Sequence, residues 1–141
     1  MINDDLKLKG KLAISINGEV VQEVDNLVVT AGKGYVASRM KDTTATAMSH
    51  MAIGSGSTAA AASDTALGNQ LGRVALTSTT VSAAVVTYVA SFPAGTGTGA
   101  VTEAGILNAS SGGTMLCRTV FSVVNKGASD SMTVTWTVTV S

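Results

Sequence analysis

Glu103 is the side chain with the clearest potential for chemistry, because it is a carboxylate inside an apolar, strand-like segment. Strand alternation puts it on the same face as Val101 and Gly105. A carboxylate among apolar neighbours must be paired, or its pKa rises. Arg73 and Arg118 are the arginines that lie in comparable strand-like segments. We therefore expect a structural ion pair between Glu103 and one of these two arginines, with a catalytic role as the alternative.

The other residues that could support a reaction are too few to form a known kind of site. His50 is the only histidine and Cys117 the only cysteine, whereas a zinc site needs several such ligands. We expect both to be packed strand residues. The alternative for Cys117 is a reactive thiol, and the alternative for His50 is an ion shared between subunits. The run 54–57 lacks the register of a nucleophile elbow and the ending of a phosphate loop, and the run 95–99 precedes a strand. This inventory predicts no catalytic residue, no metal and no cofactor, so we do not expect an enzyme.

The C-terminal part of the chain is poor in charge. Residues 43–141 contain only six charged residues, far below the roughly 25% of an ordinary domain: Asp64, Arg73, Glu103, Arg118, Lys126 and Asp130. No apolar run approaches the ~18 residues of a membrane span, and a net charge of zero favours neither nucleic acid nor an anionic membrane as partner. A surface of Thr, Ser, Gly and Ala instead indicates contacts with other protein subunits.

The two ends of the chain carry the clearest strand patterns. Residues 131–140 alternate apolar residues with threonine, as a half-buried strand does. Residues 6–24 are typical of a hairpin around Asn17-Gly18, a pair that suits a type I′ turn. We expect residues 1–25 to act as a docking arm. Its candidate contact residues are Lys7, Lys9, Lys11, Val20 and Val21.

Between these ends, short strands alternate with loops of small residues. The spacing over 30–40 predicts a helix, and 63–67 predicts one further helical turn. The expected strands are 47–53, 73–81, 85–92, 100–107 and 114–124. About eight short strands with one or two short helices indicate a single, mainly β domain over 1–141. We expect a β-sandwich or jelly roll, with a barrel as the alternative.

Two stretches of the sequence resemble a family of virion structural proteins from tailed bacteriophages. The first is 51–73, which begins MAIGSGST and ends SDTALGNQLGR. The second is 101–121, which begins VTEAGILN and ends GTMLCRTVF, and the alternating tail 130–141 completes the likeness. The resemblance covers about the last two thirds of the chain. It implies a capsid cement (decoration) protein, a sandwich or jelly roll without catalytic residues that binds the outside of the shell as a homotrimer.

This resemblance also sets the expected partners and location. The partners would be further copies of the chain and the major capsid protein, and the location would be the capsid surface of the virion. Assembly in the host cytoplasm is expected, because the start of the chain lacks a signal-peptide pattern and the single cysteine allows no internal disulfide. A tail, baseplate or fibre-attachment component involved in host recognition is the alternative.

Overall fold

A computed structural model of the chain describes residues 6–41 and 46–140, and this part is mainly β. It contains nine strands and one helix: β1 (Leu8–Ile16), β2 (Glu19–Val28), α1 (Thr30–Lys41), β3 (His50–Gly54), β4 (Gln70–Ala75), β5 (Ser78–Ser82), β6 (Val85–Phe92), β7 (Gly99–Leu107), β8 (Met115–Lys126) and β9 (Met132–Val140). The mainly β class is thus confirmed. The helix predicted over 30–40 is confirmed as α1. No helical turn forms over 63–67, where the Asp64 carboxylate accepts a hydrogen bond from the Ala61 amide instead.

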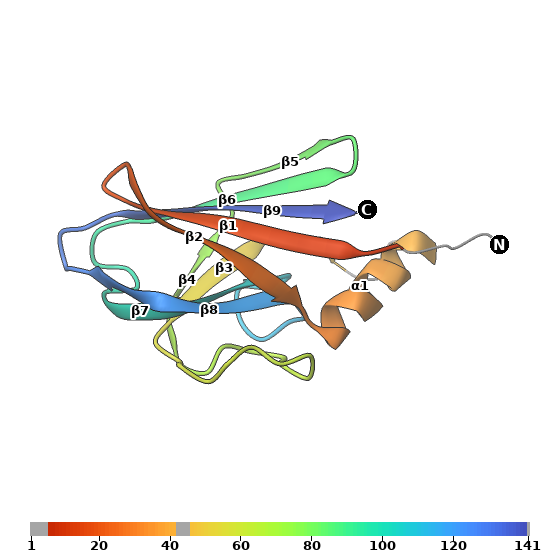
Figure 1. Ribbon diagram of the computed structural model, residues 1–141, viewed down its shortest axis with the longest axis horizontal. Helices are drawn as coiled ribbons and strands as arrows, with labels where there is room; N and C mark the ends of the chain where they lie inside the picture. Colours follow the sequence, from red (N-terminus) through yellow and green to blue (C-terminus); the bar gives the residue numbers. More distant parts are fainter. Residues whose placement is uncertain (1–5, 42–45, 141) are drawn as a thin grey trace.

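All nine strands belong to one antiparallel sheet, in the order β4-β3-β7-β8-β2-β1-β9-β6-β5. The sheet curls into a half-barrel, so that β4, at one edge, lies against β6 near the other (Figure 1). The chain passes between the two edges through Leu76 and Thr77, whose amides donate to the carbonyls of Ser49 and Val89. The single strand predicted over 73–81 is therefore wrong: β4 and β5 are separate strands at opposite edges.

A two-sheet sandwich or jelly roll is not confirmed, because hydrogen bonding is continuous through all nine strands. The join between β2 and β8 is nevertheless short, with only Leu27–Arg118 and Val28–Cys117 in register. Beyond these pairs, side chains bridge the two diverging strands. The Gln22 amide donates to the Ser122 carbonyl (2.9 Å) and accepts from the Ser122 amide (3.1 Å).

The core lies inside the curl and draws on both parts of the sheet. Its largest fully buried apolar side chains include Trp136 and Phe92 from one part and Met51 and Ile106 from the other. The alternation predicted for the last strand is confirmed, since the apolar residues of β9 up to Val138 are buried and its threonines are only partly so. Helix α1 closes one end of the curl, beside the start of β1 and the end of β9 (Figure 1).

The N-terminal hairpin is confirmed, but its strands are central in the sheet. Asn17 and Gly18 form the turn with positive φ angles of 50° and 85°. β1 pairs with β9 along its whole length and β2 joins β8, so the hairpin is not a detached arm over the described residues. A bulge leaves Val21 without a partner on β1.

No helix in the described part of the chain is long and apolar enough to cross a membrane.

Candidate functional site

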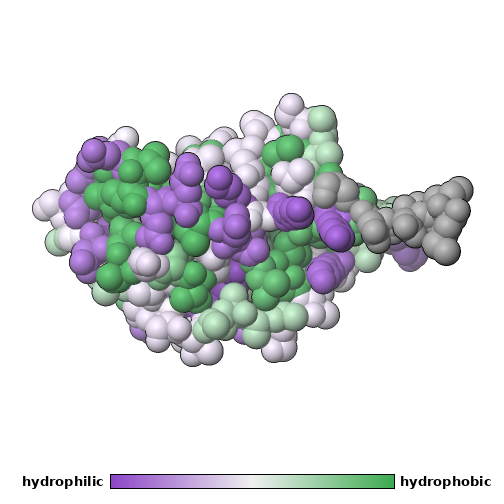
Figure 2. All heavy atoms as spheres, viewed as in Figure 1, coloured by the Kyte–Doolittle hydropathy of each residue, from purple (hydrophilic) through white to green (hydrophobic). Residues whose placement is uncertain are grey.

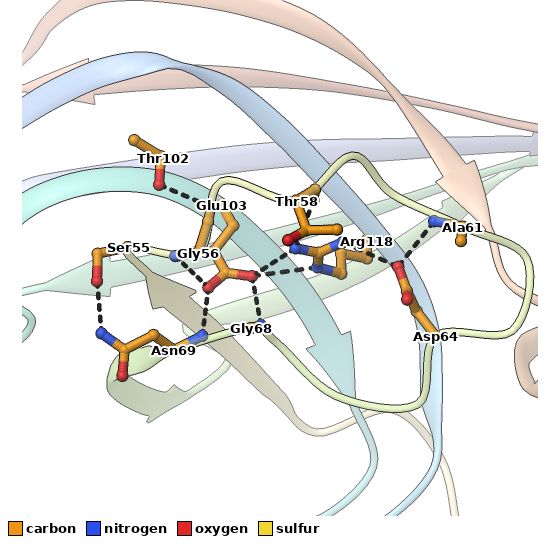
Figure 3. Close-up of polar contacts among 10 residues, drawn as sticks. All are labelled: Ser55, Gly56, Thr58, Ala61, Asp64, Gly68, Asn69, Thr102, Glu103 and Arg118. Carbon is orange, nitrogen blue, oxygen red and sulfur yellow. Dashed lines mark hydrogen bonds and ion pairs between the residues drawn. The ribbon is translucent and has the colours of Figure 1, made fainter.

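Glu103, in the middle of β7, is the centre of the most extensive polar network in the described structure. Its side chain is fully buried. Oε2 accepts hydrogen bonds from the amides of Gly56 (2.6 Å) and Asn69 (2.7 Å), and Oε1 accepts one from the amide of Gly68 (2.7 Å). These amides belong to the two ends of one long loop, which runs from β3 to β4 (Figure 3). One carboxylate thus fastens both ends of this loop to the sheet.

Arg118, on the neighbouring strand β8, completes the network. Its Nε and Nη2 donate to Oε1 of Glu103 at 3.1 and 3.0 Å. Nη1 donates to the Asp64 carboxylate at 2.9 Å, and Nη2 also reaches the Thr58 carbonyl at 3.0 Å. Arg118 is 2% exposed, so the two carboxylates share one buried guanidinium (Figure 3). Of the two arginines proposed from the sequence, Arg118 is the one that meets Glu103.

The network holds its carboxylates in the ionised form. Burial by itself raises the pKa of Glu103, but the amides of Asn69, Gly68 and Gly56 and the Arg118 guanidinium outweigh burial. The pKa of Glu103 therefore lies below its ordinary value of 4.5. The Ala61 amide and then Arg118 lower the pKa of Asp64 in the same way.

Glycines let the loop approach the carboxylate this closely. A Cβ atom at Gly56 would overlap Oε2 of Glu103, and one at Gly54 would meet both that oxygen and the Asn69 carbonyl. Gly68 lies against Gly56 on the other side of the carboxylate. The glycine-rich run 54–57 thus has a structural cause, namely close backbone approach.

The chemistry available to Glu103 is positioning rather than proton transfer. Both of its oxygens already accept at least two hydrogen bonds, and no part of the side chain reaches the surface. A general acid or base must instead contact its substrate.

Sequence reasoning anticipated the arginine partner of Glu103 but missed the three amide donors. The clustering of glycines on both sides of the loop was the available signal.

Arg73, the other candidate partner, lies in β4 and does not contact Glu103. Its guanidinium donates to the Gln70 side chain. It also donates to the carbonyls of Ala109 and Gly112, and both of these bonds are 3.0 Å long. Partial burial lowers its pKa. Arg73 therefore ties the β7–β8 loop to the edge strand β4.

Lys126 is a buried charge that the sequence reasoning did not single out. It is 1% exposed at the end of β8, and its Nζ donates to the carbonyls of Pro93 (2.9 Å) and Asp130 (2.7 Å). The nearby Asp130 carboxylate accepts from the Gly127 amide and from Asn17 Nδ2. Lys126 and Asp130 thus join the β6–β7 loop, the β8–β9 loop and the β1–β2 turn at this end of the sheet.

His50 and Cys117 do not meet. Cys117 is fully buried, and burial raises the pKa of its thiol. His50 is half-buried in β3 and shares a hydrogen bond of 2.7 Å with the Ser49 hydroxyl. Across residues 6–41 and 46–140, no three His, Cys, Asp or Glu side chains cluster as metal ligands would.

The candidate contact residues lie at opposite ends of the molecule. Lys7 and Lys9 line an apolar groove of about 530 Å³ between the start of β1 and α1. Val20 and Val21 are 57% and 51% exposed beside the turn of the β1–β2 hairpin. Lys11 lies outside this groove and forms an exposed ion pair with Glu23 at 3.8 Å. The structure therefore separates the five residues into a basic group and an apolar pair.

Comparison with known proteins places the chain in no group: no family model, curated protein or solved structure matches it. The resemblance to phage virion proteins thus stays a prediction from the sequence.

Proposed function

We propose that this chain is a non-catalytic structural protein of a tailed bacteriophage, a cement protein that binds the outer capsid surface as a homotrimer. The observation that carries the proposal is the uncharged stretch between Arg73 and Glu103, which contains no acidic or basic residue. It includes β5, whose five residues are all exposed, and β6. A sandwich-like arrangement is part of the proposal, since the strands on either side of the short β2–β8 join enclose one core.

An uncharged, exposed β5–β6 hairpin suits burial against another protein. Covering Thr, Ser, Ala and Val side chains avoids the desolvation cost of burying charges. β5 also has a free hydrogen-bonding edge, because it is the last strand of the sheet. Val81, in this strand, is 71% exposed and offers an apolar contact. We therefore assign this hairpin as the surface that meets the shell.

The stabilising mechanism would be mass action. A protein that binds the assembled lattice but not the separate subunits shifts the equilibrium towards the lattice. Several copies seated on one symmetric surface would combine modest contacts into strong retention.

The test is binding of the purified chain to capsids that lack it and to isolated tails of the same phage. We expect co-sedimentation with capsids and a higher capsid melting temperature. Val81→Lys should weaken this binding at least tenfold, whereas Ser110→Lys, in the exposed β7–β8 loop, should leave it unchanged. Binding to tails alone would favour the tail or baseplate alternative, and binding to neither particle would overturn both roles.

A further inference from the structure

The groove beside α1 is an exposed, mainly apolar concavity of about 530 Å³. Its walls are apolar residues of the first strand, the helix and the last strand, with Leu6 and Met40 at 69% and 79% exposure. A second groove of about 360 Å³ continues from it and shares Leu8, Val36 and Val140. Such a continuous exposed apolar surface is typical of a contact site.

The charges around this groove are all of one sign. Lys7, Lys9 and Lys33 line it, and no acidic residue does so. All three lysines are exposed, and none forms a salt bridge with any residue that the structure describes. The groove therefore suits an occupant that is apolar at its centre and acidic around it.

The β1–β2 hairpin of the same chain has this complementary character. Val20 and Val21 project at the bulge of β2, and Glu19 and Glu23 are exposed on the same strand, Glu23 beside Lys11 of β1. We call Glu19, Val20, Val21 and Glu23 the hairpin knob. The knob and the groove lie towards opposite ends of the long axis, as the positions of α1 and of the β1–β2 turn show (Figure 1). Figure 2 shows apolar and hydrophilic residues side by side at both of these ends.

We propose that the hairpin knob of one copy binds in the apolar, lysine-lined groove of a second copy. The occupant is a second copy because the knob carries two carboxylates for the lysines around the groove, and its two exposed valines match an apolar cavity. A chain cannot make this contact with itself, since its two surfaces lie at opposite ends. The contact is head-to-tail, so repeating it closes a ring or extends a filament. The inference rests on the proposed function in one respect, the self-association of the chain. A closed ring of three copies would be the homotrimer of that proposed function.

Charge reversal on each surface tests the contact in the pure protein, without capsids. The groove variant is Lys9→Glu with Lys33→Glu, and the knob variant is Glu19→Lys with Glu23→Lys. By sedimentation velocity, wild-type protein should associate, and each variant alone should associate at least tenfold more weakly. The control, Ser110→Glu with Ser111→Glu, adds two negative charges on the exposed β7–β8 loop, half the charge change of the groove variant, and should associate normally.

Mixing the two variants is the decisive step. The reversed groove of one matches the reversed knob of the other, and each retains one original surface, so every contact between unlike variants is complementary. The mixture should therefore associate more strongly than either variant alone, and it falls short of wild type only where a ring holds an odd number of copies. Raising the ionic strength should weaken wild-type association, because exposed charges are screened by salt. Fluorescence of the buried Trp136 verifies that each variant is folded.

Three results would overturn the proposal. The first is a wild-type chain that stays monomeric when concentrated. The second is association that both variants retain, which would point to another surface, such as the β5 edge. The third is association that appears only after removal of residues 2–5, which would assign the groove to the chain's own acidic start. The first and third results leave capsid binding through the β5–β6 hairpin untouched, and co-sedimentation with capsids tests that binding separately.

Discussion

Glu103 is the single side chain whose change should destabilise this fold most. Glu103→Gln keeps the shape but removes the charge, and its NH₂ group must then face at least one amide donor. Removing one partner of a buried pair leaves the Arg118 charge without full compensation, so we expect a loss of about 3 kcal/mol in the free energy of unfolding. Urea denaturation followed by Trp136 fluorescence measures it, since Trp136 is the only tryptophan and is buried.

A matched control for this variant is Lys11→Gln, which breaks the exposed ion pair with Glu23 and lies outside both the groove and the knob. We expect a change below about 1 kcal/mol, because exposed ion pairs contribute little. Equal losses in the two variants would contradict the central role of Glu103.

Stability should also depend on pH through the same residues. The pKa values of Glu103 and Asp64 are lowered in the folded chain, so the unfolded chain binds protons first as the pH falls. Their contribution is therefore fully present at neutral pH, begins to fall near their ordinary values of 4.5 and 3.8, and is lost below the folded values. Unfolding free energies at pH 7, 5, 4 and 3 measure this loss. The decline should be shallower in Glu103→Gln, and an identical decline would assign it to other carboxylates.

At the scale of the element, the β5–β6 turn contains a residue that suits it poorly. Ala83 adopts a positive φ of 51°, a region that costs a residue with a Cβ atom about 1 kcal/mol. Ala83→Gly should therefore raise the free energy of unfolding by up to about 1 kcal/mol. Ala84→Gly, at the next position of the turn, should lower it by about 0.5 kcal/mol, because glycine there only adds freedom to the unfolded chain. Thermal melting of both variants gives the comparison, and a destabilised Ala83→Gly would contradict this account of the turn.

For the whole molecule, local patterns predicted the elements but not their closure. Alternation located the last strand, and Asn17-Gly18 located the hairpin, because both signals lie within a few residues. The step at Leu76 and Thr77 was missed because no glycine, proline, asparagine or aspartate marks it, although the chain bends at Thr77. The order of the nine strands depends on contacts between distant segments, which no local pattern records.

The candidate site, like the fold, could be predicted from the sequence only in part. A buried carboxylate requires a partner, and this requirement pointed to an arginine. It could not choose between Arg73 and Arg118, because their strands lie at different places in the sheet. The three amide donors to Glu103 come from a loop whose path is set by its glycines and by the packing beneath it. Lys126 was missed because its acceptors are backbone carbonyls, which carry no sequence signature.

The short join between β2 and β8 gives the sheet a hinge. Two residue pairs, the Gln22 bridge and a hydrogen bond from the Thr119 hydroxyl to the Asp25 carbonyl (2.8 Å) join β2 to β8. The contact between the four strands on one side and the five on the other is therefore short, and the two sides should open as separate cooperative units. Native-state hydrogen exchange should resolve two levels of protection, and Gln22→Ala should speed exchange of the Ser122 amide without affecting β9. One uniform level of protection would mean that the whole sheet opens as a single cooperative unit. With two levels, the β5–β6 hairpin could adjust its angle to a curved lattice while the Glu103 network on the other side stays closed.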